Sequence, residues 1–333
     1  HAIMRDRLAA IDAAGLSPED QVDLRILEHR VALRMLEMSE LRAHWDPLTY
    51  VSGRGNAFAG LGTAFSQLLL RDYAPLEQRL RSFGRRCEAT PQFLFDARRV
   101  LDDEERVLPT EISKRVAVAR LRGMTGESGL FRKSLPDQLG ESAIGDEEQA
   151  GILAQCEKAV AAIDRFAGWL EAAVVPRPHG DWRLGAKLYA RKYALYMDYP
   201  LGPEALLRAA EQALEETGAA IVATGREIHD VYLADAIADG DLRPAAALDD
   251  RTVVRNIFAR VSEDRSTPDT LIADSYGMAD AIVGFVEAND LLDLPPTSKM
   301  RIEDIPPYLS GYAVAQILVA PPFRPELPSV WFW

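Results

Sequence analysis

The 333-residue chain carries 38 Lys+Arg against 51 Asp+Glu, a formal charge of -13, and 48% of its residues are hydrophobic. This composition excludes a disordered chain. The negative charge argues against nucleic acid, which proteins bind through clustered positive charge. No apolar run approaches the roughly 20 residues that a membrane-spanning helix needs. We therefore expect a globular protein with no nucleic-acid partner and no membrane span.

Cysteine usage and one basic spot bear on location and partners. Cys87 and Cys156 lie far apart in the sequence and near no histidine cluster, so we expect two free thiols in a reducing, cytoplasmic compartment. The chain opens on His1 within a helical pattern, and removal of a signal before His1 is compatible with this sequence. The four arginines between Arg79 and Arg86 are interpreted as a solvated helix face.

The first part of the chain is predicted to be helical. The first 45 residues or so have the pattern of a helical hairpin, and Ser17-Pro18 is a strong helix start, with a capping side chain followed by proline at the first helical position. Apolar residues then recur at helical spacing up to Trp45-Asp46-Pro47. Further helices are predicted at about 64–71, 75–87, 91–101 and 109–122.

The stretch from Gly123 to Gly145 interrupts the helical pattern with glycine and serine. A phosphate-binding loop needs G-x-x-x-x-G-K-[ST] between a strand and a helix, and neither the lysine spacing nor the strand is present. We therefore predict a surface loop or lid at this place.

Long helices are predicted again after this stretch, at about 147–175, from 201 to about 236 and from 267 to about 289. Pro176 and Pro178 end the first of them. A shorter helical segment follows, in which Tyr189, Tyr193 and Tyr196 share one face, which is more typical of a packing seam than of a cofactor site.

The segment 291–333 differs from the rest because eight prolines exclude long helices. We predict strands at Ala313 to Val319 and at Val330 to Trp333. The second strand has hardly begun where the chain stops, so we expect the fold to continue in this gene or in a partner. The predicted division is a helical domain, 1–290, with a sub-boundary at 176–182, and the proline-rich segment 291–333.

No catalytic or metal-binding motif is evident. A helical zinc site needs two histidines four residues apart with a glutamate between them, and none of the five histidines (His1, His29, His44, His179 and His229) has that spacing. We interpret each as an ordinary surface or half-buried residue. A G-x-S-x-G nucleophile elbow is absent, and the adjacent acidic clusters are interpreted as solvated faces.

Four blocks, taken in order, resemble the bacterial family known as domain of unknown function 885. They are LSPEDQVDLRILEHRV with WDPLTY, HGDWRLGAKLYARKYALYMDYPLGPEAL, STPDTLIADSYGMADAIVGFVEANDLLDLPP and IEDIPPYLSGYAVAQILVAPPF. The resemblance implies a mainly α fold similar to the thermostable zinc carboxypeptidases, in which helices wall a cleft and a small sheet forms its roof. The family's H-E-x-x-H-like motif lies beyond the proline-rich segment, so no zinc ligand is carried over to any residue here.

The resemblance also implies a role for the proline-rich segment. An edge strand beside the metal would pair with the peptide substrate. By position, 330–333 or 313–319 is that strand, with Tyr308, Tyr312 and Trp331 as substrate-binding residues. The alternative is that these aromatic residues only pack the roof of the domain.

Three hypotheses stay open. The chain is the N-terminal portion of a zinc-metallopeptidase-like hydrolase, with zinc expected only in the completed protein and its ligands supplied by a C-terminal fragment or a second chain. Alternatively it is a non-catalytic helical scaffold or binding module. The third reading is an unrelated helical enzyme with its own carboxylate or tyrosine site.

Overall fold

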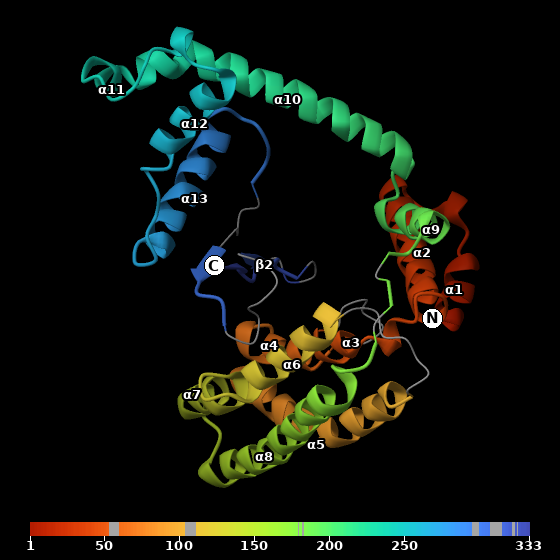
Figure 1. Ribbon diagram of the computed structural model, residues 1–333. Coiled ribbons are helices and arrows are strands. Elements are labelled where there is room, and N and C mark those ends of the chain that lie inside the picture. Colours follow the sequence, from red (N-terminus) through yellow and green to blue (C-terminus); the bar gives the residue numbers. More distant parts are fainter. Residues whose placement is uncertain are drawn as a thin grey trace. The chain divides into compact units, whose positions relative to one another are not determined.

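The computed structural model confirms a mainly helical chain with a small sheet near its C-terminal end (Figure 1). It describes residues 1–52, 60–103, 111–178, 180–181, 183–294, 300–306, 315–321, 324 and 326–333. The chain divides into two compact units, one formed by 1–196 with 289–333 and the other by 197–288. The sequence-based division at 290 differs from this one, because the sheet contacts the helices of the first unit.

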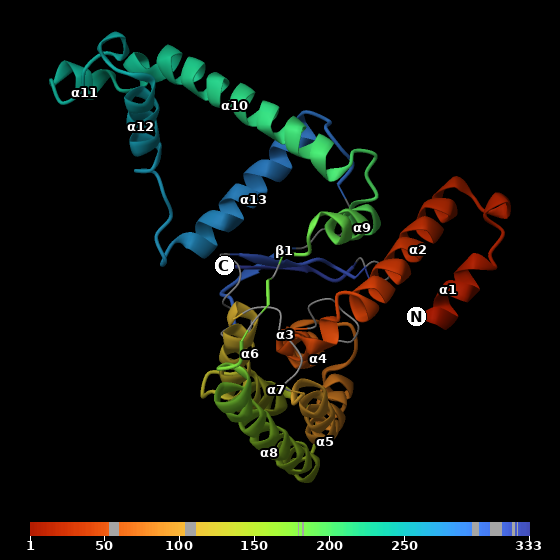
Figure 2. The ribbon, with the colours of Figure 1, turned by 45° about the vertical axis from the view of Figure 1, so that its right-hand side comes forward.

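The first unit holds the helices up to α9 and the sheet (Figure 2). Its helices are α1 (Ala2–Ala9), α2 (Pro18–Ser39), α3 (Pro47–Ser52), α4 (Leu61–Leu70), α5 (Leu76–Leu101), α6 (Glu111–Thr125), α7 (Leu135–Glu141), α8 (Asp146–Trp169) and α9 (Ala186–Met197), the last ending at the unit boundary. π-Helical segments span Leu130–Ser134 and Leu170–Val174, and 3-10 turns span Ala13–Gly15 and Ala43–Trp45.

The second unit is helical throughout. It holds α10 (Pro203–Tyr232), α11 (Ala234–Ala238), α12 (Asp250–Val261) and α13 (Leu271–Ala288), with a 3-10 turn at Ala245–Ala247. The sequence predicted α10 and α13 but missed α12, which Asp249 caps by accepting a hydrogen bond from the backbone N–H of Thr252 at 2.9 Å. Among the described residues of the whole chain, none of the helices combines the length and apolar content that crossing a bilayer requires.

Local capping sets the start of α2 as predicted. The Oγ of Ser17 accepts a hydrogen bond from the backbone N–H of Asp20 at 3.1 Å, and Pro18 occupies the first helical position. At its other end α2 is tied to α9, since the guanidinium of Arg191 donates to both carboxylate oxygens of Glu40 at 2.6 and 2.8 Å. This cap and this ion pair fix the two ends of α2.

Helix α5 runs through Pro91, although two separate helices were predicted there. A proline inside a helix costs about 3 kcal/mol. Side chains on both sides of Pro91, among them Phe83, Cys87, Leu94 and Leu101, are buried on one stripe, which is part of the core that α8 also lines. Each such side chain contributes roughly 1.5–3 kcal/mol on burial, so packing outweighs the proline penalty.

The segment Gly123 to Gly145 is not a loop or lid. It continues α6, forms the π-helical segment and then α7, and it contributes Leu130, Phe131, Leu135 and Leu139 to the core. The prediction was wrong because its glycines and serines outnumber these four apolar residues locally, while the burial of the four depends on distant helices.

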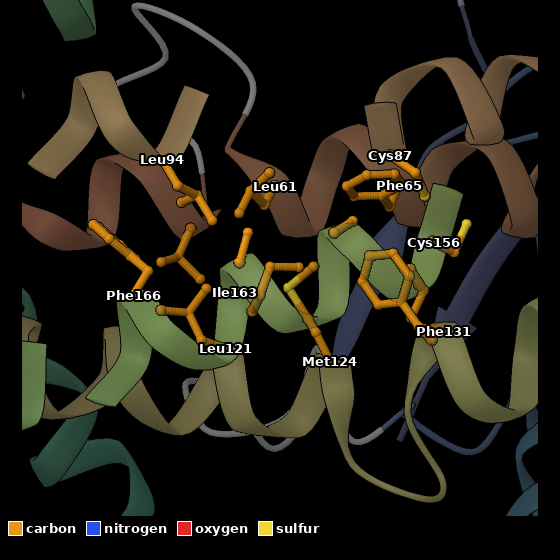
Figure 3. Close-up of a cluster of buried hydrophobic side chains, with 14 of the residues drawn as sticks. Leu61, Phe65, Cys87, Leu94, Leu121, Met124, Phe131, Cys156, Ile163 and Phe166 are labelled. Carbon is orange, nitrogen blue, oxygen red and sulfur yellow. The ribbon is translucent and has the colours of Figure 1, made fainter. Parts of the chain in front are cut away.

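An aromatic cluster sits within this core (Figure 3). The ring of Phe65 on α4 lies 4.6 Å from that of Phe83 on α5 and 5.0 Å from that of Phe131. Cys87 and Cys156, both free thiols as predicted, are also buried here between α5 and α8. Burial, together with a hydrogen bond to Cys156, raises the pKa of Cys87 above its ordinary value, so the Cys87 thiol stays protonated at neutral pH.

Two buried cations in the first unit donate hydrogen bonds to backbone carbonyls at helix ends. Arg79, predicted to be solvated, is buried and donates to the carbonyl of Leu68 at 2.7 Å while pairing with Asp72 at 2.9 Å. The ammonium of Lys114 donates to the carbonyls of Val175 at 3.0 Å and Arg177 at 2.6 Å. Carbonyls at a helix end lack intrahelical donors, which is why a cation is held at each place.

Candidate functional site

The candidate site is on the three-stranded sheet of the first unit. Its strands are β1 (Met300–Glu303), β2 (Gln316–Leu318) and β3 (Ser329–Phe332), in the order β1-β3-β2. β3 runs parallel to β1 and antiparallel to β2. β2 and β3 fall inside the two predicted strand regions, whereas β1 was not predicted.

One face of the sheet is turned towards the helices. Val330 and Phe332 on β3 are fully buried, and their partners across β1 are Arg301 and Glu303. The guanidinium of Arg301 donates to the carbonyl of Leu70 at the end of α4 at 3.1 Å. Side chains alternate between faces along a strand, so the residues between these lie on the opposite face.

The turn between α4 and α5 holds the sheet in place. Besides Arg301, which lies 3.7 Å from the carboxylate of Asp72, the guanidinium of Arg324 donates to the carbonyl of Tyr73 at 2.8 Å. Asp72 also pairs with Arg79 on α5. Cations from two parts of the proline-rich segment thus converge on one short turn, which fixes the sheet against the helical core.

The opposite face of the sheet is apolar and partly exposed. We call it the sheet face and define it by Ile302 on β1, Trp331 on β3, Ile317 on β2, and Val319 and Trp333, which follow β2 and β3. Ile302, Trp331 and Ile317 are direct neighbours across the three strands. Exposure rises in that order, from buried Ile302 through half-buried Trp331 to Ile317, which is 47% exposed. The accessible part of this face therefore lies over β2.

Two tryptophans of the sheet face carry unused hydrogen-bond donors. The rings of Trp331 and Trp333 lie 5.6 Å apart, and the Nε1 atoms of both are buried with no hydrogen-bond partner in the described part of the chain. An indole N–H can only donate, and leaving such a donor unsatisfied costs about 1–3 kcal/mol. Because both Nε1 atoms are buried, an acceptor on the exposed part of the face does not reach them.

The sheet topology decides which strand can accept a peptide. Because β3 has β1 on one side and β2 on the other, residues 329–332 do not form an edge strand as expected for 330–333. The second expected region, 313–319, contains β2, which is an edge strand of the described sheet. Of the two expected regions, only 313–319 thus contains an edge strand, and β1 forms the other edge of the described sheet.

The three predicted substrate-binding residues are only partly placed. Tyr308 and Tyr312 lie outside the described residues. Trp331 lies on the sheet face, where its direct neighbours are Ile302 and Ile317. Sequence reasoning did not name Ile302, Ile317 or Trp333 as substrate-binding residues, although Ile317 and Trp333 lay in the two predicted strand regions. Nothing in the sequence marked Ile302, because a four-residue strand between prolines has too short a pattern.

The described residues do not fit a zinc site. They contain no group of three His, Cys, Asp or Glu side chains placed to hold a metal ion. His229, expected at the surface or half-buried, is fully buried on α10. Its Nδ1 lies 2.7 Å from an Asp230 carboxylate oxygen, and its Nε2 lies 3.3 Å from the amide nitrogen of Asn256 on α12.

These contacts make His229 a link between helices. The carboxylate of Asp230 also accepts from the backbone N–H of Ala245 at 2.7 Å, and this hydrogen bond, with that to His229, lowers the pKa of Asp230. Both ring nitrogens of His229 are thus engaged within the second unit, which is the arrangement of a structural histidine.

The tyrosines of α9 form only part of the predicted packing seam. Tyr193 is buried, whereas Tyr189 and Tyr196 are exposed. The rings of Tyr189 and Tyr193 lie 6.2 Å apart. Only one of the three side chains therefore packs in this chain.

Comparison with known proteins places the whole chain in one group. A family model described as "Bacterial protein of unknown function (DUF885)" matches residues 2–333. The chain is similar to the solved structure of a putative lipoprotein of unknown function from Shewanella oneidensis, with a TM-score of 0.64 and 19% sequence identity. The match covers 99% of this chain and 55% of that chain, so this chain spans about half the length of its structural relative.

At this identity the structural similarity shows the fold alone. No curated protein matches the chain. The expected similarity to zinc carboxypeptidases has no support in these comparisons.

Proposed function

Because the chain belongs to the DUF885 family of bacterial proteins of unknown function, we propose that it is the peptide-binding portion of a zinc-metallopeptidase-like protein. In this proposal the metal ligands come from polypeptide outside the 333 residues, and hydrolysis occurs only in the completed protein. Peptides or peptide-like amides are the substrate class. The sheet face and the edge strand β2 bind the peptide.

The observation that carries the proposal is the edge strand β2, which bears the exposed apolar part of the sheet face. A peptide laid along β2 would offer backbone carbonyls and N–H groups to the strand edge, which is the usual mode of strand addition. Its apolar side chains would cover Ile317 and Val319, which are 47% and 63% exposed.

A binding titration tests the peptide site. A fluorescein-labelled Ala-Val-Leu-Val-Ala peptide is titrated with the 333-residue chain, and anisotropy is measured. We expect saturable binding that Ile317→Asp weakens by about tenfold or more, since a charge is placed where apolar surface is covered. The matched control is Ile112→Asp on α6, which places the same charge at an isoleucine that is 71% exposed on another surface and leaves binding unchanged.

Two results would contradict the proposal. If the unmodified chain shows no saturable binding, or if Ile317→Asp binds as well as Ile112→Asp, the sheet face is not the peptide site. The metal ligands are tested separately by metal analysis of protein purified without chelators. Zinc near one equivalent in the 333-residue chain would overturn their assignment to outside polypeptide.

The alternative function is a non-catalytic scaffold that keeps the peptide surface. Both functions predict peptide binding, so the discriminating test is the coding sequence around these 333 residues and hydrolysis by the polypeptide it encodes. An H-E-x-x-H motif together with zinc-dependent cleavage of the bound peptide supports the hydrolase. Binding without cleavage by the complete polypeptide supports the scaffold.

We also propose a reducing, cytoplasmic location, on the basis of the two free buried thiols. The structural relative is described as a lipoprotein, which favours an exported location instead. Fractionation of source cells, followed by detection of the chain in soluble and membrane fractions, separates the two locations.

A further inference from the structure

Helix α10 is buried only near its C-terminal end. Of its 30 residues only Gly225 and His229 are buried. Helix α12 packs at this end (Figure 1), where a Cβ added to Gly225 would lie 3.6 Å from the side chain of Val254. The part of α10 from Pro203 to Ala220 is exposed or half-buried. Because a helix gains most of its stability from packing one of its faces, we expect this part to be covered by a further surface.

The exposed surface of α10 carries an apolar seven-residue repeat. Its members are Leu207, Leu214, Ile221 and Ile228, which are 59%, 74%, 43% and 37% exposed. We call these four residues the α10 stripe. A repeat of this period places all its members on one side of the helix, and it is typical of a helix that packs along another helix.

The α10 stripe is symmetric about the step from Thr217 to Gly218. In an antiparallel pair of α10 helices with a two-fold axis at this step, Leu214 of one copy lies opposite Ile221 of the other. The two outer members of the stripe are paired in the same way. A Cβ added to Gly218 would meet nothing within 4 Å, so the helices can approach closely at the axis. The stripe is therefore complementary to a second copy of itself.

A groove borders the C-terminal half of the α10 stripe. It is an apolar cavity of about 310 Å³, open to solvent and lined by residues that include Ile221 and Ile228 of α10 and Val254, Ile257 and Phe258 of α12. An exposed apolar groove marks a site of interaction. In the antiparallel pair, the two leucines of the stripe of one copy lie over the groove of the other copy.

The two halves of α10 differ along one flank of the stripe. With about 3.6 residues per turn, Glu204, Glu211 and Glu215 lie on this flank of the N-terminal half, and Arg208 lies farther round the same side. On the same flank of the C-terminal half lies α12. Equal flanks face one another in an antiparallel two-fold pair, so the glutamates of each copy approach α12 of the other.

The exposed rim of α12 carries the opposite charge. Arg251 and Arg255 are exposed one turn apart, and neither takes part in an ion pair among the described residues. In the antiparallel pair Glu211 lies opposite residue 224 of the other copy, next to Gly225, against which α12 places Val254. Val254 lies between the two arginines in the sequence, so the charges meet at this level. The two-fold axis repeats this contact, and opposite charges across an interface favour the pairing.

We propose that a second copy of this chain binds at the α10 stripe. The two α10 helices lie antiparallel about the step from Thr217 to Gly218, and Glu211 of each copy faces Arg251 and Arg255 of the other. The contact between residues 207 and 228 extends over about 32 Å. This inference does not rest on the proposed function, because none of these residues belongs to the sheet face.

Sedimentation equilibrium of the purified 333-residue chain tests the pairing. We expect a reversible dimer, whose dissociation constant Leu214→Asp raises about a hundredfold, since a charge enters two apolar contacts. The matched control Ile112→Asp on α6 changes an isoleucine that is 71% exposed, and it leaves the dissociation constant unchanged. A monomeric unmodified chain, or equal dissociation constants for the two variants, would overturn the inference.

A charge exchange tests the facing residues. Glu211→Arg alone, and Arg251→Glu with Arg255→Glu, should each raise the dissociation constant by about tenfold, because like charges then meet. The combination of all three substitutions restores the opposite charges and should return the dissociation constant to that of the unmodified chain. If the combination dimerises no better than either partial set, the assigned charge contact is wrong.

Disulfide formation tests the orientation of the two helices. Gly218→Cys should form a linked dimer under mild oxidation, because its two copies meet at the axis. Leu207→Cys should not, since its two copies lie about 32 Å apart along an antiparallel pair. Cys87 and Cys156 are buried and do not interfere. Linkage at 207 would indicate parallel helices, and this result or the absence of linkage at 218 would overturn the inference.

Discussion

Gly129 lies where the chain turns from α6 into the π-helical segment, and replacing it with alanine tests whether this region is core or lid. Its φ of -80° and ψ of 178° are open to any residue, so the backbone torsions permit alanine. The space does not. An added Cβ would lie 2.5 Å from the carbonyl oxygens of both Gly123 and Met124.

The expected cost follows from what the new methyl group meets. Its neighbours are backbone atoms in the last turn of α6, which cannot rotate away as a side chain would. Leu130 and Phe131 follow immediately and are buried, so a shift of the backbone at 129 is transmitted into the core. Overpacking of this kind costs about 1–3 kcal/mol, and we expect the upper end.

The matched control is Gly151→Ala on α8. A Cβ there has nothing within 4 Å, and alanine in a helix is more favourable than glycine by about 0.5–1 kcal/mol. Urea unfolding followed by far-UV circular dichroism measures both variants. Because the chain has two units, hydrogen exchange of peptides from α6 and α7 reports on the first unit separately. If Gly129→Ala is as stable as Gly151→Ala, the segment is a loose lid and the packing described for it is wrong.

Three further outcomes are expected. Lys114→Met should destabilise the first unit by roughly 2 kcal/mol, because the carbonyls of Val175 and Arg177 lose their charged donor. Relief of the ammonium's desolvation penalty offsets only part of this loss. An unchanged urea midpoint would contradict the prediction. The hydrogen bond from Arg191 lowers the pKa of Glu40, so this pair stabilises the fold above the unfolded carboxyl pKa of about 4.5, and the stabilisation is lost as pH falls through the lowered folded value. The stability difference between the unmodified chain and Glu40→Gln, measured by urea unfolding from pH 3 to 7, should therefore shrink towards acid; a pH-independent difference would refute it. Cys87 and Cys156 should not react with a thiol reagent in the native protein, and both should react in denaturant. The absorbance of the thiolate that the reagent releases measures this reaction. Rapid labelling of either cysteine in the native protein would show that the contact between α5 and α8 opens readily.

Signals that act over a few residues were readable from the sequence. The start of α2 depends on Ser17 and Pro18, which satisfy donors or occupy torsions within one turn, so no distant residue is needed to place it. The prolines of 291–333 exclude long helices by local geometry, and the β structure was therefore correctly predicted near the C-terminal end of the chain. The mainly helical class followed from the same short-range periodicity.

Tertiary contacts decided the rest. Helix α5 passes Pro91 because residues on both of its sides are buried in the core that α8 shares, and the stretch after Gly123 is helical because Leu130 and Phe131 are enclosed by α4 and α5. Which strand lies at the edge depends on the pairing of β3 with two segments that precede it by up to about thirty residues, information that no local window contains. The sheet face of the candidate site exists only through that pairing, since Ile302, Ile317 and Trp331 become neighbours in space alone.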